Sequence, residues 1–190
     1  HRMNITRVIT ATILVLAATV AAAQSRELEE RAGVRAQAKD AYLVGDFRGL
    51  EHQHATYADF LRQRTSSGAF KMTLFLDGIA EARRSFTEAR LLQDIERTRV
   101  WAKEHNTAPL AHVLHAGALQ AYGGYFRGDG FANTVPPQAW KVYEEYVRKA
   151  GVYLLENEGV ASKSTTWHMW ALNTARAAGS TAGRCACGRR

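Results

Sequence analysis

Two pairs of histidines are the residues in this chain whose type and spacing could hold a metal ion. His112 and His115 are three residues apart and would share one face of a helix, whereas His52 and His54 are two apart and would not. A metal site needs at least a third ligand, and no His-Glu-x-x-His pattern accompanies either pair. We therefore predict no metal site, and keep a metal-binding protein or enzyme using His112 and His115 as an alternative.

The other common catalytic arrangements are missing from the sequence. It contains no Gly-x-Ser-x-Gly turn and no glycine loop of the kind that binds phosphate. Cys185 and Cys187 lack the spacing of haem or zinc ligands. Adjacent glutamates occur at positions 29–30 and 144–145, but neighbours on a helix point in different directions and cannot flank one bond. We predict no catalytic and no cofactor-binding residues, which favours a protein that is not an enzyme.

The N-terminal segment has the pattern of a secretory signal peptide. After Met3 it carries one positive charge, then an apolar run at residues 8–20, then small residues. We predict residues 1–23 to be the signal, cleaved after Ala23, and a periplasmic or secreted product without a membrane-bound part. An uncleaved membrane anchor is the alternative. His1 and Arg2 precede the first Met, and we assign them no function.

The formal charge of +7 is concentrated at the two ends of the chain. Between residues 24 and 183 the sequence holds 20 basic and 18 acidic residues, which are mixed along its length. Nucleic-acid binding usually requires a clustered basic face. The sequence therefore predicts no nucleic-acid partner.

Apolar residues at spacings of three and four predict helices throughout the body of the chain, and no segment alternates as a strand would. The three prolines stand where predicted helices begin. We expect seven helices, at about residues 26–44, 47–64, 70–84, 87–105, 110–126, 136–154 and 165–179.

The tripeptide Arg127-Gly128-Asp129 is a cell-adhesion sequence in some extracellular proteins. Glycines at 123, 124, 128 and 130 surround it, and glycine readily adopts the positive φ that ends a helix. We predict that this stretch ends a helix and turns the chain, and that it is not an adhesion ligand.

Paired helices with small residues in one partner and aromatic residues in the other are similar to tetratricopeptide repeats, although no strict period recurs. We predict an all-α fold, an irregular α-solenoid of antiparallel helix pairs that follows the signal peptide. Residues 24–180 would form a single helical-repeat domain. Residues 181–190 break the helical pattern, and we expect a disordered or aberrant tail there.

Four stretches in this order carry a resemblance to a family: YLVGDFRGLE, SSGAFKMTLFLDGI, VWAKEHNTAPLAHVLHAGALQAYGGYFRGDGFANTV and TTWHMWAL. Together they resemble the bacterial domain of unknown function 4034, over about residues 41 to 178. The resemblance implies an exported or envelope-associated helical protein whose chain continues further, and it implies no reaction. It points to Trp101, Pro109, Arg127, Gly128 and Trp167. The family's proline before this last tryptophan is replaced here by Thr166.

The aromatic residues are the remaining candidates for function. Tryptophans at helical spacing usually belong to a core, but on the inner surface of a solenoid they can anchor a partner peptide. We therefore take Trp101, Arg127, Trp167 and His168 as candidate partner-binding residues. The sequence predicts an exported, non-catalytic helical-repeat protein that binds a protein or peptide. The N-terminal fragment of a longer protein is a further alternative, and the partner and the oligomeric state stay open.

Overall fold

The described part of the chain is built from helices. The computed structural model describes residues 5–172 and 174–176, with side chains from residue 22 onward. Apart from one isolated antiparallel bridge between Arg64 and Phe70, these residues form no strand. The predicted all-α class is confirmed. The predicted tail at 181–190, with Cys185 and Cys187, lies outside the described residues.

Each of the seven predicted helices corresponds to a helical stretch. In chain order the elements are α1 (Ile5–Val44), α2 (Phe47–Tyr57), α3 (Lys71–Arg84), α4 (Glu88–Glu104), α5 (Pro109–Arg127), the short 3₁₀ helix η1 (Ala132–Thr134), α6 (Pro137–Glu156) and α7 (Glu158–Ala161). Residues 165–172 and 174–176 are also helical, and we call them the C-terminal segment.

Most helix ends coincide with local sequence signals. Asp46 caps α2, where its carboxylate accepts a hydrogen bond from the backbone N–H of Gly49 at 2.9 Å. Thr87 caps α4 in the same way. The α5 helix runs through Gly123 and Gly124 and stops at Arg127, one residue after its predicted end, because Gly128 takes a φ of +65°. The prediction that the stretch 127–129 ends a helix and turns the chain is therefore confirmed, and the turn begins at Gly128.

The α2 helix ends at Tyr57, although the sequence predicted a helix up to residue 64, and the loop that follows binds α1 through residues 65–67. The carboxylate of Glu27 on α1 accepts hydrogen bonds from Thr65 Oγ1 at 2.6 Å and from the backbone N–H of Ser67 at 2.9 Å. The hydroxyls of Ser66 and Ser67 donate to the same carboxylate. These hydrogen bonds favour the ionised form and lower the pKa of Glu27 well below its usual range. The carboxylate of Glu27 thus fixes the loop after α2 to α1.

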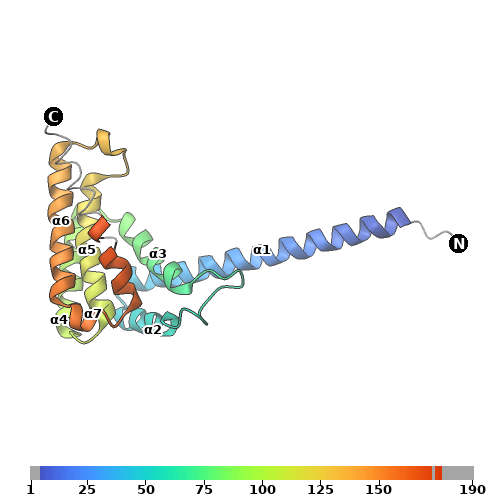
Figure 1. Ribbon diagram of the computed structural model, residues 1–190, viewed down its shortest axis with the longest axis horizontal. Coiled ribbons are helices and arrows are strands. Elements are labelled where there is room, and N and C mark those ends of the chain that lie inside the picture. Colours follow the sequence, from blue (N-terminus) through green and yellow to red (C-terminus); the bar gives the residue numbers. More distant parts are fainter. Residues whose placement is uncertain (1–4, 173, 177–190) are drawn as a thin grey trace.

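The helices form two packed groups, and α5 of the second group also contacts α3 of the first (Figure 1). The α1 helix packs along α3, with α2 beside them, while α5 packs between α4 and α6. The N-terminal part of α1 extends away from the body as a single helix (Figure 1). Among the described residues, no helix is both long and apolar enough to cross a membrane.

The buried apolar side chains divide into two clusters in the same way. The larger cluster lies between α1, α2, α3, α4 and α5 and includes Tyr42, Phe75 and Leu114. The smaller cluster lies between α5, α6 and the C-terminal segment and includes Ala150 and Trp167. Because α5 contributes to both, its sequence is buried almost continuously from Leu110 to Leu119. This explains its high content of apolar and small residues.

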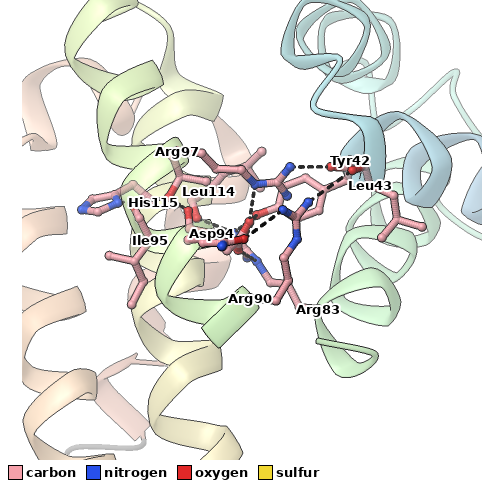
Figure 2. A network of polar contacts seen from close by, with 11 residues as sticks. Tyr42, Leu43, Arg83, Arg90, Asp94, Ile95, Arg97, Leu114 and His115 are labelled. Atoms are coloured by element: carbon pink, nitrogen blue, oxygen red, sulfur yellow. Dashed lines mark hydrogen bonds and ion pairs between the residues drawn. The ribbon is translucent and has the colours of Figure 1, made fainter. Parts of the chain in front are cut away.

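A charged network lies at the centre of the larger cluster (Figure 2). The carboxylate of Asp94 on α4 is completely buried. It accepts hydrogen bonds from Arg83 Nε at 2.9 Å, from Arg97 Nε at 2.7 Å and from the hydroxyl of Tyr42 at 2.7 Å. One carboxylate on α4 thus joins side chains of α1, α3 and α4 itself.

The two arginines extend the network to the backbone of neighbouring helices. Arg83 Nη2 donates to the carbonyl oxygen of Leu114 on α5 at 2.6 Å, and Arg97 Nη1 donates to the carbonyl oxygen of Tyr42 at 2.9 Å. Burial opposes the ionisation of Asp94, but the guanidinium groups of Arg83 and Arg97 outweigh it and lower the pKa of that carboxyl group. Burial also raises the pKa of the Tyr42 hydroxyl, which stays protonated and donates.

We predict that Asp94→Asn strongly destabilises the protein. The amide keeps the shape of the carboxylate but leaves Arg83 buried without an opposite charge, and the loss of one partner from a buried ion pair typically costs about 3–5 kcal/mol. Urea unfolding followed by circular dichroism measures the loss. Glu81→Gln removes the ion pair that Lys39 Nζ makes with Glu81 at 2.8 Å on the surface, and it should have a much smaller effect. Equal effects of the two substitutions would contradict the central role of Asp94.

Candidate functional site

An open apolar groove lies between α6 and the C-terminal segment. It has a volume of about 530 Å³. One wall is formed by Val152 and Leu155 of α6, and the other by Trp167 and Ala171 of the C-terminal segment. Val152 is 43% exposed and Leu155 is 67% exposed. Exposed apolar side chains that gather at a hollow mark a candidate binding surface.

The groove exists because α6 carries apolar residues on more than one face. Val147, Ala150 and Leu154 follow spacings of three and four and are buried. Val152 and Leu155 fall beside this stripe, so the same rotation that buries the stripe leaves them facing outward. At the deep side of the groove Gly151 permits the two helical walls to approach, since an added Cβ would lie 3.1 Å from Thr174 Cγ2.

Burial and a hydrogen bond hold Trp167 in the wall of the groove. Trp167 is almost fully buried, and its indole Nε1 donates a hydrogen bond to the carbonyl oxygen of Leu154 at 3.3 Å. Glu144 and Arg148, one helical turn apart on α6, add one charge of each sign to the lining. The groove therefore combines an apolar surface with a few charged side chains, which is the usual composition of a peptide-binding groove.

The C-terminal segment is fixed to the body by polar contacts at its start. His54 Nε2 on α2 lies 2.9 Å from the hydroxyl oxygen of Ser164 and 3.2 Å from that of Thr166. At the other end of the segment the side chain of Gln120 on α5 donates to the hydroxyl of Thr174. These contacts keep the wall that carries Trp167 in place.

The structure separates the four candidate residues predicted from the sequence. Trp167 lines the groove, and His168 is exposed beside it, with the two ring centroids 4.9 Å apart. Trp101 lies in the larger core, where it stacks on Phe47 with ring centroids 4.4 Å apart. Arg127 lies at the end of α5.

Like Trp101, Arg127 makes its contacts within the chain. Arg127 Nη1 donates to the carbonyl oxygen of Gly128 at 2.6 Å, and its guanidinium lies 5.5 Å from the ring of Trp140.

The sequence analysis missed Val152 and Leu155 as candidate binding residues. They could have been recognised in the sequence, because both are large apolar residues that fall outside the buried stripe of α6.

His112 and His115 are buried on α5, and each has a partner within the chain. His112 Nδ1 lies 2.9 Å from the hydroxyl oxygen of Tyr153, and its Nε2 lies 2.9 Å from the carbonyl oxygen of Asn106. His115 Nδ1 lies 3.2 Å from Thr98 Oγ1. Over the described ranges, no group of three or more potential metal ligands comes together. In the described structure, these two histidines pack in the interior and form hydrogen bonds with other residues of the chain.

Burial keeps two of the histidines neutral. It lowers the pKa of His54 to about 4 and, together with the nearby positive charge of Arg83, it lowers the pKa of His115 to about 4. An unfolded chain has histidines with an ordinary pKa near about 6.5 and so binds more protons than the folded protein between these values. The free energy of unfolding therefore falls as the pH decreases from 6.5 towards 4.

We predict that His115→Phe removes a large part of this pH dependence. A shift of one pKa unit corresponds to about 1.4 kcal/mol, so each buried histidine can contribute roughly 2–3 kcal/mol of loss between pH 7 and 4.5. Phenylalanine fills the same space against Tyr153, and Thr98 keeps its hydrogen bond to the carbonyl oxygen of Asp94. Urea unfolding at a series of pH values measures the slope. His168→Phe on the surface is the matched control, and an unchanged slope in His115→Phe would contradict the assignment.

Comparison with known proteins adds no relative to these observations. No family model matches the chain, and no curated protein and no solved structure matches it. The resemblance to domain of unknown function 4034 stays a prediction, and the function has to be argued from the geometry of the site.

Proposed function

We propose that the protein is a non-catalytic binding module that receives a helical segment of a partner protein or peptide in the groove between α6 and the C-terminal segment. The observation that carries this proposal is the exposure of Leu155 at the edge of an open apolar groove. Covering this side chain with a partner lowers the free energy, because burial of apolar surface contributes about 25 cal/mol per Å².

A helical partner suits the shape and chemistry of the groove. Its two walls are themselves helices, so a third helix can lie along them with apolar residues at positions i, i+3, i+4 and i+7. Glu144 and Arg148 would pair with opposite charges beside that apolar stripe. Full burial of an exposed Leu side chain contributes about 1.5–3 kcal/mol, so a few such contacts support a reversible interaction.

The composition of the groove supports binding rather than catalysis. Its described lining includes one carboxylate and one guanidinium, with no histidine or cysteine beside them. General acid–base or nucleophilic catalysis needs a titrating or nucleophilic group within hydrogen-bond reach of a second one.

Three further parts of the proposal are supported by the sequence and by the packing of the helices. The apolar run at residues 8–20 supports export to the periplasm or beyond. The helix pairs α4–α5 and α5–α6 support an irregular, tetratricopeptide-like array of antiparallel helices. The ordered stretches between residues 41 and 178 support membership of the family of unknown function.

Selection from a random peptide library tests the groove. The library should be displayed in segments of about four helical turns and selected against the purified chain. We expect enriched peptides to share apolar residues at helical spacing. We further expect Leu155→Glu to weaken their binding by at least about tenfold, which corresponds to about 1.4 kcal/mol.

The chain offers a matched control for this experiment. Leu61 is 82% exposed and lies in the loop after α2, outside the lining of the groove. Leu61→Glu introduces the same change and should leave peptide binding as it is. Both are surface substitutions, and we expect each to alter stability by no more than about 0.5 kcal/mol. Absence of enrichment, or equal binding by Leu155→Glu, would refute the proposal.

A further inference from the structure

A second hollow, of about 480 Å³, lies on the other side of the C-terminal segment, between α3 and α5. Its lining is mostly apolar and aromatic and includes Phe86, Tyr125 and Trp170. Gly128 and Asp129 of the turn after α5 lie at its edge. The hollow thus combines parts of the chain that are distant in sequence, and its residues do not overlap with those of the groove.

A buried cation faces this hollow. Arg83 belongs to its lining, although the residue is only 5% exposed. Its Nε and Nη2 are occupied by Asp94, the hydroxyl of Tyr42 and the carbonyl oxygen of Leu114. Its Nη1 makes no hydrogen bond within the described part of the chain. This nitrogen lies on the side of Gly117, where an added Cβ would come within 2.6 Å of it.

The charge of the network is unbalanced. Among the residues that the structure describes, Asp94 alone provides a carboxylate to Arg83 and Arg97, and Tyr42 is protonated. One positive charge is therefore left over, in a place where burial makes electrostatic interactions stronger than in water. Two further charged residues line the hollow, Arg84 and Asp129. Both are exposed and opposite in sign, so they largely offset each other.

Gly117, in the middle of α5, allows Arg83 and Trp170 to pack closely against this helix. Glycine inside a helix is less favourable than alanine by about 1 kcal/mol. An alanine at position 117 would place its methyl group 2.6 Å from Arg83 Nη1 and 3.1 Å from Trp170 Cη2, between the cation and the aromatic wall. Gly117 therefore lets the guanidinium of Arg83 and the ring of Trp170 lie close to the backbone of α5, where both residues line the hollow.

We propose that this hollow binds a small organic monoanion, a carboxylate on an apolar body. The carboxylate accepts a hydrogen bond from Arg83 Nη1, and the apolar body packs against Trp170 and Phe86. A charge-assisted hydrogen bond of this kind is about twice as strong as a neutral one. A dianionic phosphate group fits less well. Arg83 is the buried cation of the described lining, Arg84 is exposed to solvent, and Asp129 would repel a second negative charge.

Titration of the full chain with simple acids tests this site. The probes are octanoate and 3-phenylpropionate, and octan-1-ol and 3-phenylpropan-1-ol are their uncharged counterparts. Binding is measured by isothermal titration calorimetry and by the shift of the Trp170 indole resonance. We expect the acids to bind at least about tenfold more tightly than the alcohols, since only they can pair with Arg83.

Filling the hollow is a better test than removing Arg83, whose loss would disrupt the core. Gly124 lines the hollow, and a Cβ added there meets nothing within 4 Å, so Gly124→Leu should place its side chain in the open space without a backbone clash. We expect Gly124→Leu to weaken octanoate binding by at least about tenfold. Gly33→Leu on α1 is the matched control, because an added Cβ there also meets nothing within 4 Å.

The outcomes separate this site from the groove. The groove variant Leu155→Glu should bind octanoate as the unchanged chain does, because Leu155 is not part of the hollow's lining. The proposal is overturned if neither acid binds, if the alcohols bind as tightly as the acids, or if Gly124→Leu binds octanoate like Gly33→Leu.

Discussion

The fold depends on a single buried carboxylate. Asp94 has no contact with solvent, so its charge has to be satisfied entirely by protein groups, and those groups come from α1, α3 and α4. Arg83 then links this centre to the backbone of α5. Because a buried charge without its partners is very unfavourable, the helices around Asp94 can assemble in few other ways. Apolar packing supplies most of the free energy of such a core, whereas the network restricts which arrangement that packing takes.

Arg83 has a second consequence for the surface of the protein. A guanidinium group has five N–H donors in a fixed plane, and a single buried carboxylate that also binds Arg97 and Tyr42 cannot accept from all of them. Arg83 Nη1 is left without an acceptor among the described residues. In this fold it faces the hollow beside Gly117. The same side chain that orders the core therefore gives the neighbouring cavity its positive charge.

The sequence allowed the helices to be predicted because their ends are determined locally. Asp46, Thr87 and Pro109 mark helix starts through contacts within a few residues. The network could not be predicted in this way, since Tyr42 and Asp94 are far apart in the chain and an acidic residue within a helix usually faces solvent. The loop after α2 depends on Glu27 in a distant part of α1. The groove was missed because it depends on where the C-terminal segment lies against α6.

The C-terminal segment connects the two candidate binding sites. Trp167 belongs to the lining of the groove, and Trp170, three residues later, belongs to the lining of the hollow that Arg83 faces. Polar contacts fix both ends of this segment, and the neutral ring of His54 at Ser164 makes one of them. Since both tryptophans belong to one short helical stretch, the position of that stretch determines the shape of both sites. The stretch is thus the part of the fold through which the two surfaces depend on each other.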